Sequence, residues 1–270
     1  MAPQAPNTHL QHGNRASTSS SGSADLLQAL GCPLSPPTAH AGIPASQHPY
    51  FNFLLAPNYH PRLAPLGPLR RALPHRTLLN LLGPLVNPAR PAGLVVGVAR
   101  PELGPVFAHA LARDAAVEHA LVVCGAEHLD EISIAGDTHV WEVKRAPPAA
   151  NANANADADA DADVVLEPTI SEYTIHPSDF GLPVHHLSAV AGGSPADNSA
   201  YLIALLSIHP TPDFVQPICD YVLLNAAALL VVSGLAEDWK EGVQKARESI
   251  DEMWAWHAFT DFKKFDRGEL

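Results

Sequence analysis

The middle of the chain alternates between short apolar runs and one helical repeat of apolar positions. Residues 94–99 are rich in valine, which predicts a buried strand, and Pro101 follows as a favoured first residue of a helix. Residues 119–124 form a second apolar run, which Gly125 ends. A strand, a helix and a strand with short links make a βαβ unit, whose strands are parallel and whose ligands gather beyond the carboxyl ends of the strands. The helix is expected to bury one face, on which these apolar residues recur at helical spacing: Leu103, Val106, Phe107, Ala110 and Leu111.

Further elements flank this unit. Short apolar runs predict strands at residues 51–55, 140–143 and 170–175, and Gly31 is expected to stop a short helix over residues 24–30. The C-terminal part predicts helices over residues 197–206, 214–234 and 237–265. The last helix is expected to bury a stripe of Val243, Ile250, Met253 and Trp254. Strands mixed with helices around one sheet give the α/β class, here with a central, largely parallel sheet and a C-terminal helical layer.

Composition divides the chain into a leader, one domain and a tail. Residues 147–164 are almost wholly Ala alternating with Asn and then Asp, which gives no side chains for a core and predicts a surface insert. We expect a disordered leader over residues 1–10, an α/β domain over residues 11–265 that contains this insert, and a tail over residues 266–270. No function is assigned to the insert.

The charge and the cysteines narrow the class of partner and the compartment. The net charge of -12 argues against a nucleic-acid or anionic-membrane partner. The most apolar run, residues 221–235, is shorter than the roughly 20 residues of a membrane span, and no secretory signal follows Met1. The three cysteines are far apart and odd in number, so we expect no disulfide and a reducing, cytoplasmic location.

The first candidate for chemistry is a stretch of glycine and hydroxyl residues before the first predicted helix. It runs from His12 to Asp25 and contains one arginine, Arg15. Backbone N–H groups at the start of a helix, with hydroxyl groups around them, can form a phosphate cradle. The alternative is a plain serine-rich linker with Ser23 as the N-cap, and the residues alone favour this linker.

Two charged pairs supply further candidates. Arg70-Arg71 offers guanidinium groups that suit the planar carboxylate of a small aromatic acid, or forms an ordinary surface pair. Asp130-Glu131 follows the second strand of the βαβ unit, at the edge where ligands gather. Carboxylate oxygens are the hard ligands that Mg²⁺ prefers, although an acidic pair in a loop is also commonly only solvated.

Several separated motifs stand in the order typical of one enzyme family. The longest is Arg-Thr-Leu-Leu-Asn-Leu-Leu-Gly-Pro-Leu-Val-Asn-Pro-Ala at residues 76–89. An Ala-Pro-x-x-His-Pro motif stands at residues 56–61 and a Leu-Asp-Glu motif at residues 129–131. Shorter matches follow this order: Gly97-Val98, residues 179–182, Gly192-Gly193 and residues 224–228. Together they resemble the anthranilate phosphoribosyltransferases over about residues 12–250, which implies an α/β catalytic domain like that of nucleoside phosphorylases and phosphoribosyltransferases.

The resemblance implies a reaction and a set of site residues. The reaction is transfer of the phosphoribosyl group from phosphoribosyl pyrophosphate (PRPP) to anthranilate, in tryptophan biosynthesis, with release of pyrophosphate. It requires charge neutralisation and positioning, so no residue is expected to act as a covalent nucleophile. Asp130 and Glu131 match the family's Mg²⁺ ligands, while Asn14 and Arg70 match positions that contact anthranilate. The residues that match the PRPP loop are His12, Gly13, Asn14, Arg15, Ala16, Ser17, Thr18, Ser19 and Ser23.

Two departures from the family pattern bear on activity. Gln11 stands where the family has lysine, and nothing before Gly13 matches the family's glycine-rich motif or its N-terminal helical domain, which forms the homodimer. We therefore expect impaired turnover by this chain. Two alternatives stay open: a non-catalytic remnant that binds a ligand or a full-length partner, and a nucleoside phosphorylase. Residues 80–84 and the Asp130-Glu131 pair disfavour the phosphorylase.

Overall fold

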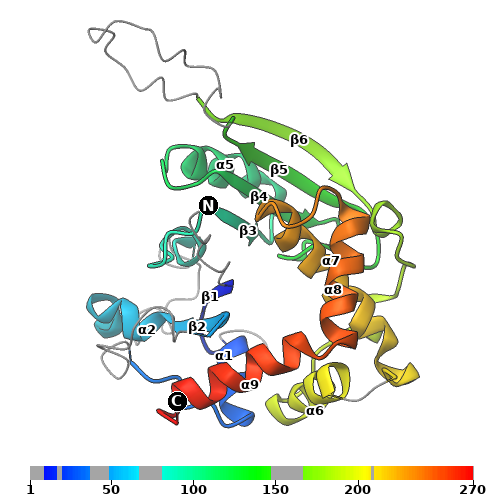
Figure 1. Ribbon diagram of the computed structural model, residues 1–270. Helices are drawn as coiled ribbons and strands as arrows, with labels where there is room; N and C mark the ends of the chain where they lie inside the picture. Colours follow the sequence, from blue (N-terminus) through cyan, green and yellow to red (C-terminus); the bar gives the residue numbers. More distant parts are fainter. Residues whose placement is uncertain are drawn as a thin grey trace, which may run out of the picture. The chain divides into compact units, whose positions relative to one another are not determined.

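The computed structural model describes residues 9–16, 20–36, 49–66, 81–146, 167–207 and 210–269 (Figure 1). Arg70, residues 17–19 and the Ala/Asn/Asp insert, all singled out from the sequence, lie outside the described residues. Residues 11–265, which we expected to form one domain, divide into two compact units that are described separately. Unit 1 comprises Met1–Ala89, His185–Leu223 and Gln244–Leu270, and unit 2 comprises Arg90–Val184 and Leu224–Val243.

Unit 1 contains a parallel pair of strands, β1 (His9–Gly13) and β2 (Phe51–Leu55). Strand β1 begins inside the predicted leader, because His9 and Leu10 pair with the first residues of β2. The prediction of a disordered leader is therefore wrong for these two residues. Helix α1 (Ser23–Ala29) follows β1 in the chain, and α2 (Ala56–Tyr59) follows β2. One core gathers apolar side chains from α1, the segment after it, β2 and the C-terminal helix: Ala24, Leu27, Cys32, Leu34, Phe53, Leu55, Phe259 and Phe262.

Short helical turns and the longer helix α6 complete the central part of unit 1. These elements are η3 (Pro61–Leu66), η4 (Gly83–Leu85), η7 (Leu187–Ala189), α6 (Pro195–Ser207) and η8 (Asp213–Val215). The prediction of a helix over residues 197–206 is confirmed by α6, which extends it slightly at both ends.

The last part of the chain forms α7 (Gln216–Val232), α8 (Trp239–Asp251) and α9 (Trp254–Asp266). The single helix predicted over residues 237–265 is wrong, because Met253 adopts the left-handed region with φ of 60° and separates α8 from α9. The break changes the helical phase, so positions beyond it leave the predicted buried stripe. Ile250 is buried, whereas Trp254 is 55% exposed.

One helical stretch, residues 213–232, is long and apolar enough to cross a membrane by length and composition alone. The sequence-based count considered only residues 221–235 and is wrong on length, because the helical stretch starts earlier. The side chains of Cys219, Asp220, Leu223 and Leu224 on this stretch are almost fully buried. Such burial, with a carboxylate included, is typical of a helix in a protein core.

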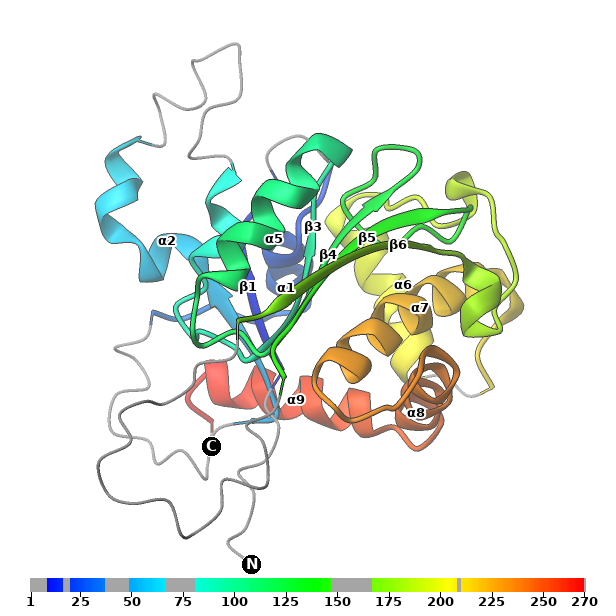
Figure 2. The same ribbon diagram turned by 90° about the horizontal axis from the view of Figure 1, so that it is seen from above.

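Unit 2 is built on a sheet with the strand order β3-β4-β5-β6. The strands are β3 (Gly93–Gly97), β4 (His119–Gly125), β5 (Thr138–Lys144) and β6 (Thr169–Ile175). The parallel strands β3 and β4 are joined through η5 (Pro101–Leu103) and α5 (Gly104–Ala112), which confirms the predicted βαβ unit. Figure 2 shows α5 along one face of these strands. The turn η6 (Pro177–Phe180) follows β6.

Strands β5 and β6 extend the sheet with the opposite polarity. Strand β5 pairs antiparallel with β4, and β6 pairs antiparallel with β5. The prediction of a largely parallel sheet thus holds for the pairs β1–β2 and β3–β4 and is wrong for this edge. The physical reason lies in the connection, because residues 126–137 contain no helix to carry the chain back for a parallel crossover.

Helix α5 buries a narrower face than the apolar pattern predicts. Its buried positions are Gly104, Phe107, Ala108 and Leu111, a helical spacing that points one stripe at the sheet. Val106 is 62% exposed, so its predicted burial is wrong. Gly104 is required at this face, because a Cβ atom there would lie 2.2 Å from the ring of Trp141.

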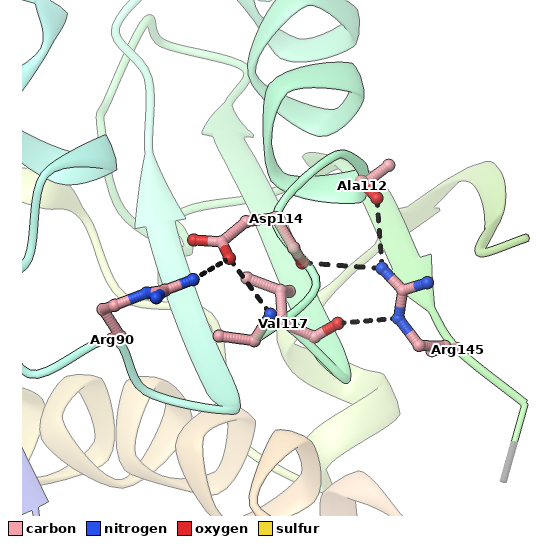
Figure 3. Close-up of polar contacts among 6 residues, drawn as sticks. Arg90, Ala112, Asp114, Val117 and Arg145 are labelled. Carbon is pink, nitrogen blue, oxygen red and sulfur yellow. Dashed lines mark hydrogen bonds and ion pairs between the residues drawn. The ribbon is translucent and has the colours of Figure 1, made fainter. Parts of the chain in front are cut away.

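An arginine ties the end of α5 to the neighbouring strand (Figure 3). Arg145 donates through Nε to the carbonyl of Val117 at 3.2 Å, and through Nη2 to the carbonyls of Ala112 at 3.1 Å and Asp114 at 3.5 Å. The Asp114 carboxylate in turn accepts a hydrogen bond from Arg90 Nη2 at 2.8 Å. Carbonyls at the end of a helix have no partner inside the helix, so the guanidinium stabilises this terminus.

Candidate functional site

The predicted PRPP residues that the structure describes lie at the end of β1, in the loop after it and at the start of α1. Gly13 ends β1 beneath Phe53 and Ser23, and a Cβ atom on Gly13 would lie 2.8 Å from the Phe53 ring and 2.8 Å from Ser23 Oγ. A Cβ atom on Gly22 would lie 2.5 Å from the backbone nitrogen of Ala16. The two glycines therefore allow the two arms of the loop to pack closely.

The carboxylate of Asp25 holds the two arms together. It accepts hydrogen bonds through Oδ2 from the backbone N–H groups of Ala16 at 2.8 Å and Gly22 at 2.9 Å. These bonds, with a smaller contribution from Arg15, lower the pKa of Asp25 despite partial desolvation. The N-cap of α1 is Gly22, so Ser23 is the first helical residue and not the cap that the linker interpretation assigned to it. The hydrogen bonds of Asp25 thus bring Ala16 and Gly22 together, a contact that the polar sequence of this stretch does not indicate.

The Gly192-Gly193 motif contacts this loop within unit 1. Ser20 Oγ donates to the carbonyl of Gly193 at 2.8 Å. The side-chain amide of Asn198 brackets the same glycine, accepting from its N–H at 2.8 Å and donating to its carbonyl at 3.4 Å. A Cβ atom on Gly193 would lie 2.8 Å from Asp197 Oδ2. A second glycine motif, distant in sequence, therefore supports the loop.

Two histidines from separate motifs meet beside this loop. The rings of His12 and His60 pack edge to face with centroids 5.2 Å apart. The Nε2 atom of each ring is buried and has no hydrogen-bond partner in the described part of the chain. Burial and the neighbouring His60 lower the pKa of His12, against an opposing hydrogen bond with the backbone of Gly83. Two buried polar atoms without partners among the described residues indicate a place for a ligand or ordered water. The sequence analysis did not select His60, although it stands in the motif at residues 56–61.

In unit 2 the predicted metal ligands follow the end of β4. The chain turns after Gly125, which bridges to Leu129, and His128 adopts the left-handed region with φ of 64°. Asp130 and Glu131 come next, and both are exposed. The structure therefore confirms that this acidic pair lies beyond the carboxyl end of a parallel strand.

The acidic pair fits Mg²⁺ better than a metal that needs a full protein cage. No group of three or more His, Cys, Asp or Glu residues is placed to hold a metal ion in the described ranges. Mg²⁺ commonly keeps several water ligands and binds through one or two carboxylates together with substrate phosphates. The hard oxygen atoms of Asp130 and Glu131 fit this requirement.

The cysteines do not supply a nucleophile. Burial raises the pKa of all three thiols, Cys32, Cys124 and Cys219, and that of Cys32 reaches about 11. A thiol with a raised pKa is protonated at neutral pH and is a weak nucleophile.

Known proteins resemble the chain over most of its length. Residues 8–255 match the family model described as "Glycosyl transferase family, a/b domain". An anthranilate phosphoribosyltransferase of Schizosaccharomyces pombe is 41% identical over 254 residues, which are 93% of this chain and 64% of the relative. The crystal structure of anthranilate phosphoribosyltransferase from Thermus thermophilus is 33% identical with a TM-score of 0.77, and the match covers 97% of this chain and 70% of that one. The chain belongs to the anthranilate phosphoribosyltransferase family.

Family membership confirms the resemblance of the sequence motifs and the α/β class. A further family structure, from Saccharomyces cerevisiae in complex with PRPP and Mg, is 30% identical with a TM-score of 0.78 over 97% of this chain and 65% of that chain. The chain spans less than two thirds of the S. pombe relative. Of the site residues that the family suggests, His12–Ala16 and Ser23 lie in unit 1, whereas Asp130 and Glu131 lie in unit 2.

Proposed function

We propose that this chain carries the residues with which an anthranilate phosphoribosyltransferase binds PRPP, anthranilate and Mg²⁺. The products would be N-(5-phosphoribosyl)anthranilate and pyrophosphate. The observation that supports this most directly is the pair of hydrogen bonds by which Asp25 holds Ala16 and Gly22 together, among the residues that match the family's PRPP loop. A cytoplasmic location and the family's homodimer belong to the same proposal.

The reaction requires the protein to position its two substrates, anthranilate and PRPP. A new bond forms between the amino nitrogen of anthranilate and the anomeric carbon of the ribose, while the bond from that carbon to pyrophosphate breaks. Holding two substrates in the attacking geometry lowers the barrier without a covalent intermediate. The loop would hold PRPP, and Asn14 with Arg70 would orient anthranilate, Arg70 through the carboxylate. Asp130 and Glu131 would hold Mg²⁺, which neutralises charge on a departing diphosphate.

The proposal is tested with the purified chain, PRPP and MgCl₂. Anthranilate is fluorescent, so its consumption is followed directly, and PRPP binding is measured by calorimetry on the same preparation. We expect PRPP binding that depends on Mg²⁺ and a slow loss of anthranilate that depends on both. Binding without turnover would support the non-catalytic alternative, and phosphorolysis of a nucleoside would support the phosphorylase. The absence of both PRPP binding and anthranilate turnover would contradict the proposal.

The role of Arg70 is tested by a neighbouring control. Arg70→Ala is expected to raise the KM for anthranilate at least tenfold, about 1.4 kcal/mol, because a charge-assisted bidentate contact is lost. Arg71→Ala serves as the matched control and should leave this KM within about twofold, because it removes the same charge at a position that does not match an anthranilate contact of the family. An unchanged anthranilate KM in Arg70→Ala would contradict the assignment.

A further inference from the structure

We infer that Asn225 is a positioning residue for the metal-binding pair Asp130-Glu131, and this inference rests on the proposed function. Asn225 lies in α7, 93 residues from Ile132, the residue that follows the acidic pair. Nothing in its local sequence points to a metal. The structure brings it to the backbone of the segment that carries both carboxylates.

The side-chain amide of Asn225 binds both backbone groups of Ile132. The N–H of Ile132 donates to Asn225 Oδ1 at 3.2 Å, and Asn225 Nδ2 donates to the carbonyl of Ile132 at 3.3 Å. Because one donor and one acceptor are matched to one acceptor and one donor, the amide can bind in only one orientation. Ile132 is only 1% exposed. Its side chain is therefore held by the core, while its backbone is held by Asn225.

A second contact fixes the other end of the acidic pair. Gly97, at the end of β3, lies against the backbone of Asp130 so closely that a Cβ atom would stand 1.7 Å from the Asp130 carbonyl oxygen. Any larger residue at position 97 would displace this segment. The backbone of residues 130–132 is therefore held by Gly97 at its start and by Asn225 at its end.

This geometry brings residues of three separate motifs together. Gly97-Val98, Leu129-Asp130-Glu131 and Asn225 are far apart in sequence and meet in unit 2. The carboxylates themselves are exposed, and Gly97 and Asn225 contact the backbone of the segment that carries them. Residues that hold metal ligands in place typically change metal affinity 10–100-fold when they are removed.

The competing explanation is that Asn225 only satisfies the buried backbone of Ile132 and stabilises the fold. Metal affinity of a folded variant separates the two explanations, because a purely structural role would lower stability without changing the affinity of the folded molecule. Asn198 provides a matched control, because it makes the same paired contact with Gly193 in unit 1.

The experiment titrates the full chain with Mn²⁺, a paramagnetic substitute for Mg²⁺, and follows water-proton relaxation. Asp130→Asn identifies the signal of the acidic pair by abolishing most of it. In Asn225→Ala we expect about tenfold weaker Mn²⁺ binding, while Asn198→Ala binds Mn²⁺ like the wild type. Hydrogen exchange should show reduced protection of the Ile132 amide in Asn225→Ala.

Folding of each variant is checked by circular dichroism. If Asn225→Ala fails to fold, Asn225→Asp replaces it, because it keeps the acceptor for the Ile132 N–H and loses the donor to the carbonyl. The same direction of change is expected, even though the variant adds a negative charge. Unchanged Mn²⁺ affinity in a folded Asn225 variant would overturn the positioning role alone. Absence of Mn²⁺ binding by the wild type, or full binding by Asp130→Asn, would overturn both this role and the metal assignment of the proposed function.

Discussion

The buried carboxylate of Asp220 accepts a hydrogen bond from the ring of His185 at 2.8 Å. The same carboxylate accepts a bond from Gln216 Nε2 at 2.9 Å and pairs with Arg247 Nη2 at 3.5 Å. All four residues belong to unit 1, and only 3% of Asp220 is exposed. Desolvating a carboxylate is costly, and the three donors offset this cost as long as every donor stays in place.

Removing this carboxylate should destabilise unit 1. Asp220→Ala leaves three polar groups facing a cavity, and we expect a loss of about 3 kcal/mol in the free energy of unfolding, as for other broken buried pairs. Urea denaturation measures the change. Asp261→Ala is the control, because Asp261 is exposed and lies 3.9 Å from Lys264; it should change stability by less than about 0.5 kcal/mol. Equal effects of the two substitutions would contradict this account.

The hydrogen bonds that Asp25 accepts from Ala16 and Gly22 should make the stability of the protein depend on pH in the acid range. The folded-state pKa lies below the ordinary value of 3.8, so the stabilising contribution is fully present above that value and is lost as the pH falls through the folded pKa. Asp25→Asn removes this contribution at neutral pH. We expect the difference in unfolding free energy between wild type and Asp25→Asn to shrink below pH 3.8. If this difference in unfolding free energy stays constant as the pH is lowered well below 3.8, the hydrogen bonds of the Asp25 carboxylate do not stabilise the protein.

The arginine contacts of Figure 3 predict unequal roles for two arginines in unit 2. Arg145→Ala should lower stability by about 2 kcal/mol, because it leaves carbonyls at the end of α5 without a charged donor. Arg90→Ala should cost less than about 0.5 kcal/mol, because both members of the Arg90–Asp114 pair are substantially exposed. Thermal unfolding of the two variants side by side tests this. A larger effect of Arg90→Ala would contradict it.

The contact of Gly104 with Trp141 predicts an overpacked variant. Gly104→Ala places a methyl group within 2.2 Å of the indole ring, so α5 or the ring must move, at a cost of about 1–3 kcal/mol. Gly136→Ala is the control, because a Cβ atom there meets only a Glu127 side-chain oxygen at 3.8 Å. The change in near-ultraviolet dichroism of Trp141 reports the local movement. Two variants of equal stability would show that the helix adapts freely.

Local patterns in the sequence were sufficient for the βαβ unit, whereas the loop at residues 12–23 was selected only by its resemblance to the family. Apolar runs and the proline at position 101 locate β3, α5 and β4, because these elements follow from short-range spacing. The motifs at residues 12–23 and 129–131 locate the candidate site by resemblance. Both kinds of information are contiguous in the chain.

The features that the sequence did not predict depend on distant contacts or on a single backbone angle. Met253 separates α8 from α9 without a glycine or proline to mark the break. The antiparallel orientation of β5 and β6 depends on which strands pair, and strand pairing is not visible in the local sequence. The contacts of Asn225 with Ile132 and of His12 with His60 join residues from separate motifs, so no local pattern marks them.

The pairing of β5 with β6 makes their connection the place where we expect the chain to tolerate changes in length. Lys144 and Thr169 face each other in the ladder, and Thr169 Oγ1 donates to the Lys144 carbonyl at 3.1 Å, so the two ends of the intervening segment are fixed together. The entropy of closing such a loop grows only with the logarithm of its length, about 0.6 kcal/mol for each doubling. A peptide tag or a small folded module grafted between residues 147 and 164 should therefore leave the register of the sheet intact, which makes this connection a practical handle for immobilising or labelling the protein.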